Sequence, residues 1–234
     1  MSSARNAPAA AARPRVAIFG GTFNPIHLGH LRAAEEAVEL LGLDRVLFVP
    51  SGDPPHKEGQ ASDPLAPAKL RLDWVRLATQ DNPRFAVEAL EVERGGRSYS
   101  VDTLRAIAPR LAPERPIFLI GHDAFALMDT WRDPEAIFAL AHLAVIVRPG
   151  GSPGIGGSLS EWIPKRLRDD VALAPDGRSA LHHAGTWIRR IEIAGLDVSA
   201  SELRARLRKG LSLRYLLPEP VRLAVEQSGV YGSS

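Results

Sequence analysis

Two histidines, His27 and His30, stand three residues apart in the stretch GGTFNPIHLGH at residues 20–30. If a helix begins here, the two rings lie one helical turn apart and project to the same side. Two imidazoles beside a polyphosphate can donate hydrogen bonds to oxygens that gain negative charge during an in-line displacement at phosphorus. The pair therefore predicts a phosphoryl-type transfer that depends on positioning and charge stabilisation, without a covalent intermediate.

The residues around the histidines also favour phosphate binding. Gly20 and Gly21 allow a close approach of the backbone, and Thr22 adds a hydroxyl donor. Gly29 lies inside the predicted helix, where glycine costs about 0.5–1 kcal/mol relative to alanine, so a flat nucleobase against the bare backbone would explain it. The start of a helix attracts phosphate through unpaired N–H groups and a partial positive charge. A tight turn and a capping histidine would explain single residues, but not the whole set.

Strand and helix patterns alternate along the rest of the chain. Short apolar runs predict strands at Arg15–Phe19, Arg45–Val49, Arg84–Val92, Pro116–Ile120, His142–Val147 and Trp187–Ile193. Apolar residues at helical spacing predict helices at Leu28–Leu41, Pro67–Gln80, Val101–Leu111, Ala124–Met128 continuing near Pro134–Leu140, Ala200–Lys209 and Glu219–Gln227. This alternation predicts an α/β fold with a parallel sheet and helices on both faces. Such sheets bind ligands at the carboxyl ends of strands, near the point where strand order reverses, and Gly20 and Gly21 end the first strand.

Length and composition are those of a single α/β domain. The chain has 234 residues, of which 45% are hydrophobic and 24% charged. We expect a disordered extension over residues 1–14 and one domain over residues 15–234. Pro149–Gly157 is rich in glycine and proline, and the region up to about residue 185 has one weak helical pattern, Leu159–Leu167. We therefore expect a long surface excursion at about 149–185.

Composition also excludes several classes of site and partner. The chain has no cysteine, which removes disulfides, thiolate zinc sites and cysteine nucleophiles and fits a cytoplasmic protein. A net charge of +2 does not favour nucleic-acid binding, and no apolar run is long enough for a membrane span. Neither GxxxxGK[ST] nor GxGxxG occurs, so a P-loop and a dehydrogenase are both disfavoured. No oligomeric state follows from the sequence.

The segment His27-Leu28-Gly29-His30 resembles the (H/T)xGH signature of a nucleotidyltransferase superfamily. Further stretches narrow the resemblance: Pro50–Lys57, Ser98–Leu104, Gly121–Asp123 with Trp131, Arg148–Gly150, Val198–Arg204 and Gly229–Tyr231. In their order and spacing over about Val16–Tyr231, these stretches resemble bacterial nicotinate-nucleotide adenylyltransferases. The resemblance implies a Rossmann-like fold and the transfer of an adenylyl group from ATP to nicotinate mononucleotide. Deamido-NAD and pyrophosphate would be the products, in NAD biosynthesis, with Mg²⁺ carried by the ATP.

The resemblance also assigns roles to individual residues. His27, His30 and Arg204 would act in catalysis. The ATP site would comprise Gly20, Gly21, Thr22, Phe23, Gly29, Lys57, Gly121, Asp123, Ser199 and Ser201, with Asp123 on the ribose hydroxyls. The acceptor site would comprise Asn24, Ser100, Trp131 and Arg132. Backbone N–H groups around Ser100 and Trp131–Arg132 would meet the carboxylate of the acceptor. No protein metal ligand is expected.

Simpler interpretations remain for several of these residues. Ser199 and Glu202 alone satisfy a helix-capping box, and Arg204 could face the mouth of the sheet or solvent. Trp131 could belong to the core. His122 and the pair His182–His183 lack a partner pattern for a metal. Adenylyl transfer to nicotinamide mononucleotide or phosphopantetheine, or a non-catalytic nucleotide sensor, are the alternative functions.

The chain departs from the usual family pattern at the acceptor and phosphate positions. Ser100 stands where threonine is usual, and Ser199-Ala200-Ser201 occupies the positions where Ser-Ser-Thr is usual. Arg132 occupies a position that is often tyrosine, and His122 one that is usually small. The added charge of Arg132 is expected to favour an acidic acceptor.

Overall fold

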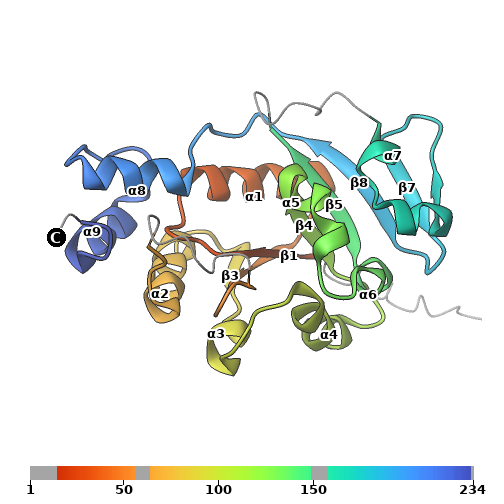
Figure 1. Ribbon diagram of the computed structural model, residues 1–234, viewed down its shortest axis with the longest axis horizontal. Coiled ribbons are helices and arrows are strands. Elements are labelled where there is room, and N and C mark those ends of the chain that lie inside the picture. Colours follow the sequence, from red (N-terminus) through yellow and green to blue (C-terminus); the bar gives the residue numbers. More distant parts are fainter. Residues whose placement is uncertain (1–14, 56–63, 149–157, 233–234) are drawn as a thin grey trace, which may run out of the picture.

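The computed structural model describes residues 15–55, 64–148 and 158–232 (Figure 1). Strand β1 (Val16–Gly21) lies between β2 (Arg45–Pro50) and β4 (Ile117–Gly121), and it is parallel to both. The full order is β3-β2-β1-β4-β5-β8-β7-β6 in one eight-stranded sheet. The remaining strands are β3 (Phe85–Val87), β5 (His142–Val147), β6 (Val171–Leu173), β7 (Ser179–His182) and β8 (Trp187–Glu192). Strand order therefore reverses between β1 and β4, where a ligand site is expected.

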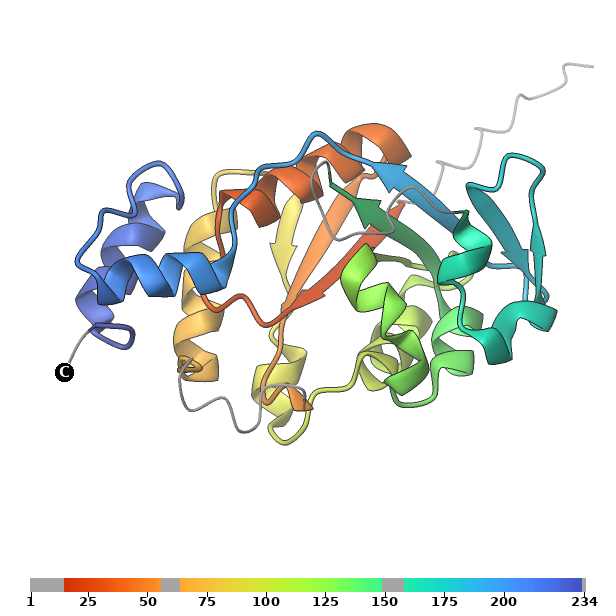
Figure 2. The same cartoon turned by 45° about the horizontal axis from the view of Figure 1, so that its top comes forward.

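Successive residues of the central strands enter two separate cores. Ala17 packs in a cluster with residues of α1 (Leu28–Leu41), α2 (Ala68–Thr79), α8 (Ala200–Arg208) and α9 (Glu219–Ser228). Ile18 packs in a second cluster with α4 (Ser100–Leu111), α5 (His122–Ala126), α6 (Pro134–Leu140) and α7 (Leu159–Trp162). Helices thus cover both faces of the sheet (Figure 2), and the predicted single-domain α/β fold with a mostly parallel sheet is confirmed.

Helix α1 has the predicted bounds, whereas the predicted strand Arg84–Val92 is wrong in its second half. Strand β3 ends at Val87, and α3 (Leu90–Arg94) follows. The alternating apolar residues of this stretch suggested one strand. Instead, the carboxylate of Glu88 accepts a hydrogen bond from the backbone of Leu90 at 3.3 Å, at the start of the helix. The buried carboxylate of Glu91 accepts from the Thr103 hydroxyl, which ties α3 to α4.

The expected surface excursion contributes to the sheet and to the core. Within its described part, η3 (Lys165–Asp170) leads into strands β6 and β7, which pair antiparallel beyond β8. Leu159 and Leu167 are fully buried. The turn between β6 and β7 contains Asp176-Gly177, with Gly177 at φ +64°, and Asp-Gly is a strong local signal for a hairpin. That signal was missed because the Gly/Pro-rich segment earlier in the chain, residues 149–157, suggested one long loop; this segment lies outside the described residues.

The buried side chain of Arg71, in α2, joins the loops that follow β1 and β2. Its guanidinium donates to the carbonyl oxygens of Thr22 and Gly52, each at 2.7 Å, and to that of Ala66 at 2.9 Å. The side chain is fully buried, and burial lowers its pKa to about 10, so it remains charged at neutral pH. One cation therefore fixes the loops at the carboxyl ends of two neighbouring strands.

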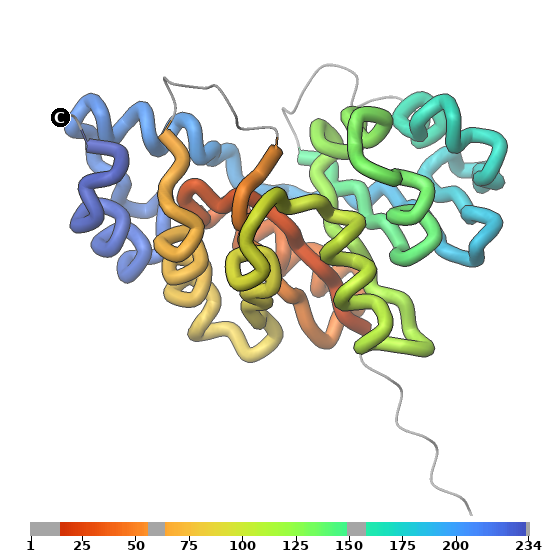
Figure 3. Tube along the Cα trace, turned by 60° about the horizontal axis from the view of Figure 1, so that its bottom comes forward, coloured from red at the N-terminus to blue at the C-terminus, as the bar shows by residue number. Residues whose placement is uncertain are grey.

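Helix α9 completes this side of the molecule by packing beside α2 (Figure 3). The rings of Trp74, in α2, and Tyr231, just after α9, lie 5.9 Å apart. The Tyr231 hydroxyl donates to the side-chain oxygen of Asn24, in the loop after β1. Segments from both ends of the described chain therefore meet beside the same loop.

Replacing Arg71 by methionine leaves three carbonyl oxygens without their donor. We expect Arg71→Met to lower the free energy of unfolding by about 3 kcal/mol or more, measured by urea denaturation. Arg76→Met is the matched control, because Arg76 lies in the same helix with a 54% exposed side chain beside Asp73. Its effect should stay within about 0.5 kcal/mol. Equal losses in the two variants would contradict the role given to Arg71.

Candidate active site

Two cavities meet where strand order reverses. The larger, of about 520 Å³, lies beside the start of α4 and is called the α4 cavity; its lining includes Gly21, Ser100 and Trp131. The smaller, of about 310 Å³, lies beside the start of α8 and is called the α8 cavity; its lining includes His27, His30 and Ser199. Both cavities are lined by Phe19 and Gly121, at the ends of β1 and β4. A ligand in one cavity can therefore reach a ligand in the other across the sheet edge.

The two histidines stack at the start of α1. Their ring centroids are 3.7 Å apart, with 30° between the ring planes. The backbone N–H of His27 donates to Nδ1 of His30 at 3.3 Å. Because Nδ1 accepts this bond, a neutral His30 ring carries its proton on Nε2. His30 is thus set to donate from Nε2, while Nδ1 of His27 is buried with no hydrogen-bond partner among the described residues.

Both rings are uncharged in the free protein. Burial, with a smaller effect of the Arg148 charge, lowers the pKa of His27 to about 3. Burial, followed by His27 and Arg148, also lowers the pKa of His30 well below its ordinary value. Each neutral ring can donate one N–H to an oxygen on phosphorus as negative charge develops on that oxygen.

The glycines near the histidines make room for protein groups. A Cβ on Gly29 would lie 3.0 Å from Nδ1 of His27 and 3.3 Å from the Leu196 carbonyl oxygen. A Cβ on Gly21 would lie 2.9 Å from the ring of Phe23. The expectation that a nucleobase accounts for Gly29 is therefore corrected: the His27 ring and the backbone at Leu196 already occupy that space, although Gly29 also lines the α8 cavity.

The start of α1 offers fewer free donors than the sequence suggests. The N–H of Leu28 donates to the Leu216 carbonyl at 3.1 Å, and the N–H of His27 is bound to the His30 ring. At the start of α8, Ser199 caps the helix, and its hydroxyl accepts from the N–H of Glu202 at 3.2 Å. The capping role considered for Ser199 is confirmed, and the residue also lines the α8 cavity.

Three predicted site residues lie behind the cavities. Phe23, with φ +48°, is buried against Gly21 and the His30 ring. The amide of Asn24 donates to the Pro64 carbonyl at 3.0 Å and accepts from the Ala66 N–H at 3.0 Å. Arg204 is fully buried, so the alternative that it faces solvent is wrong. These three residues support the loop between β1 and α1, and none of them lines either cavity.

Arg204 reaches that loop from α8. Its guanidinium donates to the Asn24 carbonyl oxygen and, at 2.9 Å, to the hydroxyl of Ser201. A phosphate contact of Arg204 or Ser201 stays a prediction, and it would require the guanidinium to share its N–H donors between these oxygens and the phosphate.

The α4 cavity combines the start of a helix with an aromatic ring. Ser100 is the first residue of α4, and the half-buried Trp131 packs its ring 6.4 Å from that of Phe118. The N–H of Trp131 already donates to the Met128 carbonyl at 3.1 Å, so this expected donor to an anion is engaged within the protein. The first turn of α4, with the Ser100 hydroxyl, is left as the main feature of this cavity that favours an anion.

The guanidinium of Arg132 is engaged within the protein. It lies 3.2 Å from the Asp102 carboxylate and 4.9 Å from the centre of the Tyr99 ring. Arg132 lines the α4 cavity, and its partner Asp102 also lies 3.6 Å from Arg105, so one carboxylate faces two guanidinium groups.

Of the remaining predicted residues, two line the α4 cavity, one lines neither cavity, and one lies outside the described residues. Gly20 and Thr22 line the α4 cavity. Asp123 lies in the first turn of α5 with a 66% exposed side chain, 3.7 Å from Nδ1 of His122. Lys57 lies outside the described residues.

Arg148 is a site residue that the sequence analysis did not assign. It follows β5, lines the α8 cavity with its side chain exposed, and acts on the pKa of both histidines. Its position in the sequence could have indicated this role. Arg148 directly follows an apolar strand, and the carboxyl end of that strand lies at the same sheet edge as Gly21 and Gly121.

A group of possible metal ligands lies away from both cavities. Asp170, His182 and His183 have ligand atoms within 4.8 Å of one another, at the hairpin of β6 and β7. Nδ1 of His182 already accepts from the Ala184 N–H at 3.2 Å. This hairpin position separates the group from the site described above. Among the described helices, none is both long and apolar enough to cross a membrane.

Known proteins are similar to this chain in sequence and in fold. The cytidylyltransferase-like family matches residues 18–206. The chain is 41% identical to a probable nicotinate-nucleotide adenylyltransferase of Citrifermentans bemidjiense, over 93% of this chain and 98% of the relative. It is 39% identical to one from Geobacter sulfurreducens, with the same coverage. The Plasmodium falciparum nicotinic acid mononucleotide adenylyltransferase complexed with NaAD shares the fold, with a TM-score of 0.66, 15% identity and coverage of 94% and 98%.

The buried His27 makes folding stability depend on pH. Its pKa is about 3 in the folded protein and about 6.5 when unfolded, so between these values the unfolded chain binds more protons. The stability due to neutral His27 is complete above about pH 6.5 and is lost as the pH falls toward 3. Between pH 7 and pH 5, the free energy of unfolding of His27→Gln should fall by about 2 kcal/mol less than that of the wild type. Urea denaturation at the two pH values measures this.

The control for this experiment is Leu40→Gln, a change at a 57% exposed position of α1 that adds and removes no titratable group. It should follow the wild-type dependence on pH. If His27→Gln follows the wild type as well, the ring is not buried uncharged in the folded protein.

Proposed function

The chain belongs to the nicotinate-nucleotide adenylyltransferases of the cytidylyltransferase-like family, and on this premise we propose how its two cavities carry out the reaction. The protein transfers the adenylyl group of ATP to nicotinate mononucleotide, which forms deamido-NAD and releases pyrophosphate. The observation that carries this proposal is the meeting of the two cavities at Phe19 and Gly121, with the neutral histidine pair on one side of the junction.

ATP occupies the α8 cavity in this proposal. His27 and His30 then lie beside the α-phosphate, and the start of α8 at Ser199 lies beside the nucleotide. The exposed guanidinium of Arg148, at the same cavity, adds positive charge for the phosphates. The carboxylate of Asp123, exposed in the first turn of α5 two residues after Gly121, accepts from the ribose hydroxyls in this proposal.

Nicotinate mononucleotide occupies the α4 cavity. The ring of Trp131 offers a face for the pyridine, and the first turn of α4 favours the carboxylate. The 5′-phosphate then extends toward Gly20 and Gly21, where bare backbone allows close approach at the end of β1. In this arrangement the nucleophilic oxygen and the α-phosphorus meet at the junction of the two cavities.

The reaction needs one bond to form and one to break at the α-phosphorus. A 5′-phosphate oxygen of the acceptor attacks, and the bond to the oxygen that bridges the α- and β-phosphates breaks. Pyrophosphate leaves with the bonding electrons. Negative charge on the non-bridging oxygens is met by the N–H of His30, held on Nε2 by the bond that Nδ1 accepts, and by His27.

A divalent metal accompanies ATP in nucleotidyltransferases of this family, and we propose Mg²⁺ carried on the ATP phosphates. The lining of the α8 cavity includes no carboxylate among the described residues. Glu91, in the lining of the α4 cavity, already accepts from Thr103. Phosphate oxygens and water would therefore supply the ligands, as is usual for Mg²⁺ bound with a nucleotide. The cytoplasmic location expected from the missing cysteines stays a prediction.

Removing the His30 ring should slow the chemical step more than it weakens ATP binding. We expect His30→Ala to lower kcat by ~100-fold or more, with a smaller change in the KM for ATP, because the charge to be stabilised develops in the transition state. Pyrophosphate release at saturating substrates measures this. Near-normal turnover would remove the histidine from the chemistry.

Acceptor choice tests the substrate assignment. The acid should be preferred over nicotinamide mononucleotide by at least roughly tenfold in kcat/KM, because an amide NH₂ would face the donors at the start of α4 and leave one unpaired. Pyrophosphate release from ATP should be compared with the acid, the amide and phosphopantetheine. Ser100→Ala should lower the ratio of kcat/KM for the acid to kcat/KM for the amide. Better use of the amide or of phosphopantetheine would overturn the acceptor, and no release with any acceptor would favour a non-catalytic nucleotide sensor.

A further inference from the structure

The connector between β8 and α8, residues 193–199, forms one wall of the α8 cavity. Val198 and Ser199 belong to the lining of the cavity. The carbonyl oxygen of Leu196 lies beside Gly29, since a Cβ added there would be 3.3 Å from it. Figure 2 shows this connector running beside α1 on its way to α8. Its position relative to α1 therefore sets the width of the cavity between His27 and Ser199.

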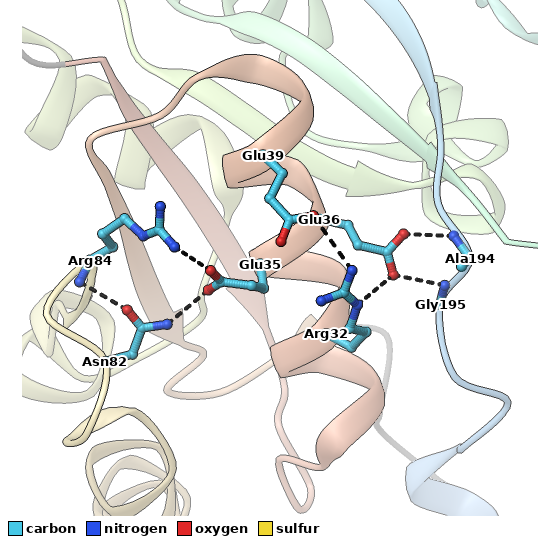
Figure 4. Close-up of polar contacts among 8 residues, drawn as sticks. All are labelled: Arg32, Glu35, Glu36, Glu39, Asn82, Arg84, Ala194 and Gly195. Carbon is cyan, nitrogen blue, oxygen red and sulfur yellow. Dashed lines mark hydrogen bonds and ion pairs between the residues drawn. The ribbon is translucent and has the colours of Figure 1, made fainter.

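A buried carboxylate on α1 holds the connector in place. Glu36 accepts hydrogen bonds from the N–H groups of Ala194 at 2.6 Å and Gly195 at 3.0 Å (Figure 4). It also accepts from Nε of Arg32 at 2.9 Å. The residue is 6% exposed. Burial acts to raise the pKa of Glu36, but the hydrogen bonds from Gly195, Ala194 and Arg32 outweigh it and lower the pKa, so the carboxylate is ionised.

The same contact reaches Arg148 through Gly195. Gly195 has φ +59°, a conformation that favours glycine. A Cβ there would lie 3.2 Å from Cγ of Arg148, so the aliphatic part of this arginine packs against the connector. The guanidinium of Arg148 is exposed at the α8 cavity. A shift of the connector would therefore move both the wall of the cavity and one of its cations.

Spacing on α1 links Glu36 to the cavity directly. Gly29, Ala33 and Glu36 lie at positions i, i+4 and i+7, on one face of the helix. Gly29 and Ala33 line the α8 cavity, and Glu36 continues the same face two turns from Gly29. The helix that begins at His27 thus also carries the group that fixes the opposite wall.

We propose that Glu36 is a positioning residue for ATP: it binds the β8–α8 connector to α1 and keeps the α8 cavity open at the width that the nucleotide needs. The inference rests on the proposed placement of ATP in the α8 cavity. The proposal predicts an effect on ATP and not on the acceptor, because the connector contributes residues to the lining of the α8 cavity and none to that of the α4 cavity.

The neighbouring Glu35 is a matched control. It lies in the same helix, and its carboxylate accepts from the Asn82 amide at 2.8 Å and from the guanidinium of Arg84 (Figure 4). These contacts join α1 to the segment before β3, away from the connector. A glutamine at position 35 or 36 removes one charge from the same helix, but only the change at 36 acts on the cavity wall.

The test measures binding of α,β-methylene-ATP by calorimetry, together with the KM for nicotinate mononucleotide. In Glu36→Gln the side-chain NH₂ would face a backbone N–H, so one bond to the connector is lost. We expect the Kd of the nucleotide to rise at least fivefold while the KM for the acceptor changes less than twofold. Glu35→Gln should leave both constants within twofold. An unchanged Kd in Glu36→Gln, or an equal rise in Glu35→Gln, overturns the proposal.

Gly195→Ala tests the same wall without touching Glu36. The added methyl group strains the backbone at φ +59° and presses on Arg148, so the Kd should rise as in Glu36→Gln. If Glu36→Gln does not fold, this variant decides, and an unchanged Kd again overturns the proposal. Pyrophosphate release by the wild type is a separate measurement. Its absence would overturn the proposed function, whereas the response of nucleotide binding to these variants judges the role of Glu36.

Discussion

The buried guanidinium of Arg71 is the contact on which the geometry of the site depends. A parallel sheet fixes its strands, but the loops at their carboxyl ends have no ladder to hold them, and these loops carry the chemistry. Arg71 joins the carbonyls of Thr22 and Gly52, which follow β1 and β2, to that of Ala66 before α2. A charged donor at this depth is stable only because carbonyl oxygens surround it. These bonds fix the positions of two loops that contribute Thr22 and Ser51 to the lining of the α4 cavity.

A second layer of buried polar contacts supports the start of α1. Asn24 binds Ala66, and the carbonyl of Asn24 accepts from Arg204, which belongs to α8. The same helix contributes Ser199 and Ala200 to the cavity that holds the histidines. Buried amides and guanidinium groups have directional bonds, so this network fixes one arrangement of the loop where apolar packing alone would permit several. Uncharged histidines follow from this packing, since water has little access to His27.

The sequence predicts the parts of the structure that depend on local pattern. The bounds of α1 follow from helical spacing and from Gly42, which takes the left-handed conformation at its end. The place of the site follows from glycines at the ends of β1 and β4. The roles of Asn24 and Arg204 do not follow from local pattern, because their side chains bind partners 40 or more positions away: Pro64 for Asn24, and Asn24 for Arg204. The α3 turn was missed for a related reason: the partner of Glu91 is Thr103, in another helix.

The bond between Tyr231 and Asn24 has a consequence for how the protein is made. The two residues are 207 positions apart in the chain, and Asn24 lies three residues before His27. During synthesis the sheet and α1 can form while the C-terminal segment is still inside the ribosome. The loop that leads to the histidines gains its last partner only when that segment emerges. A nascent chain can thus be largely folded while the loop before the histidines still lacks the bond from Tyr231 to Asn24.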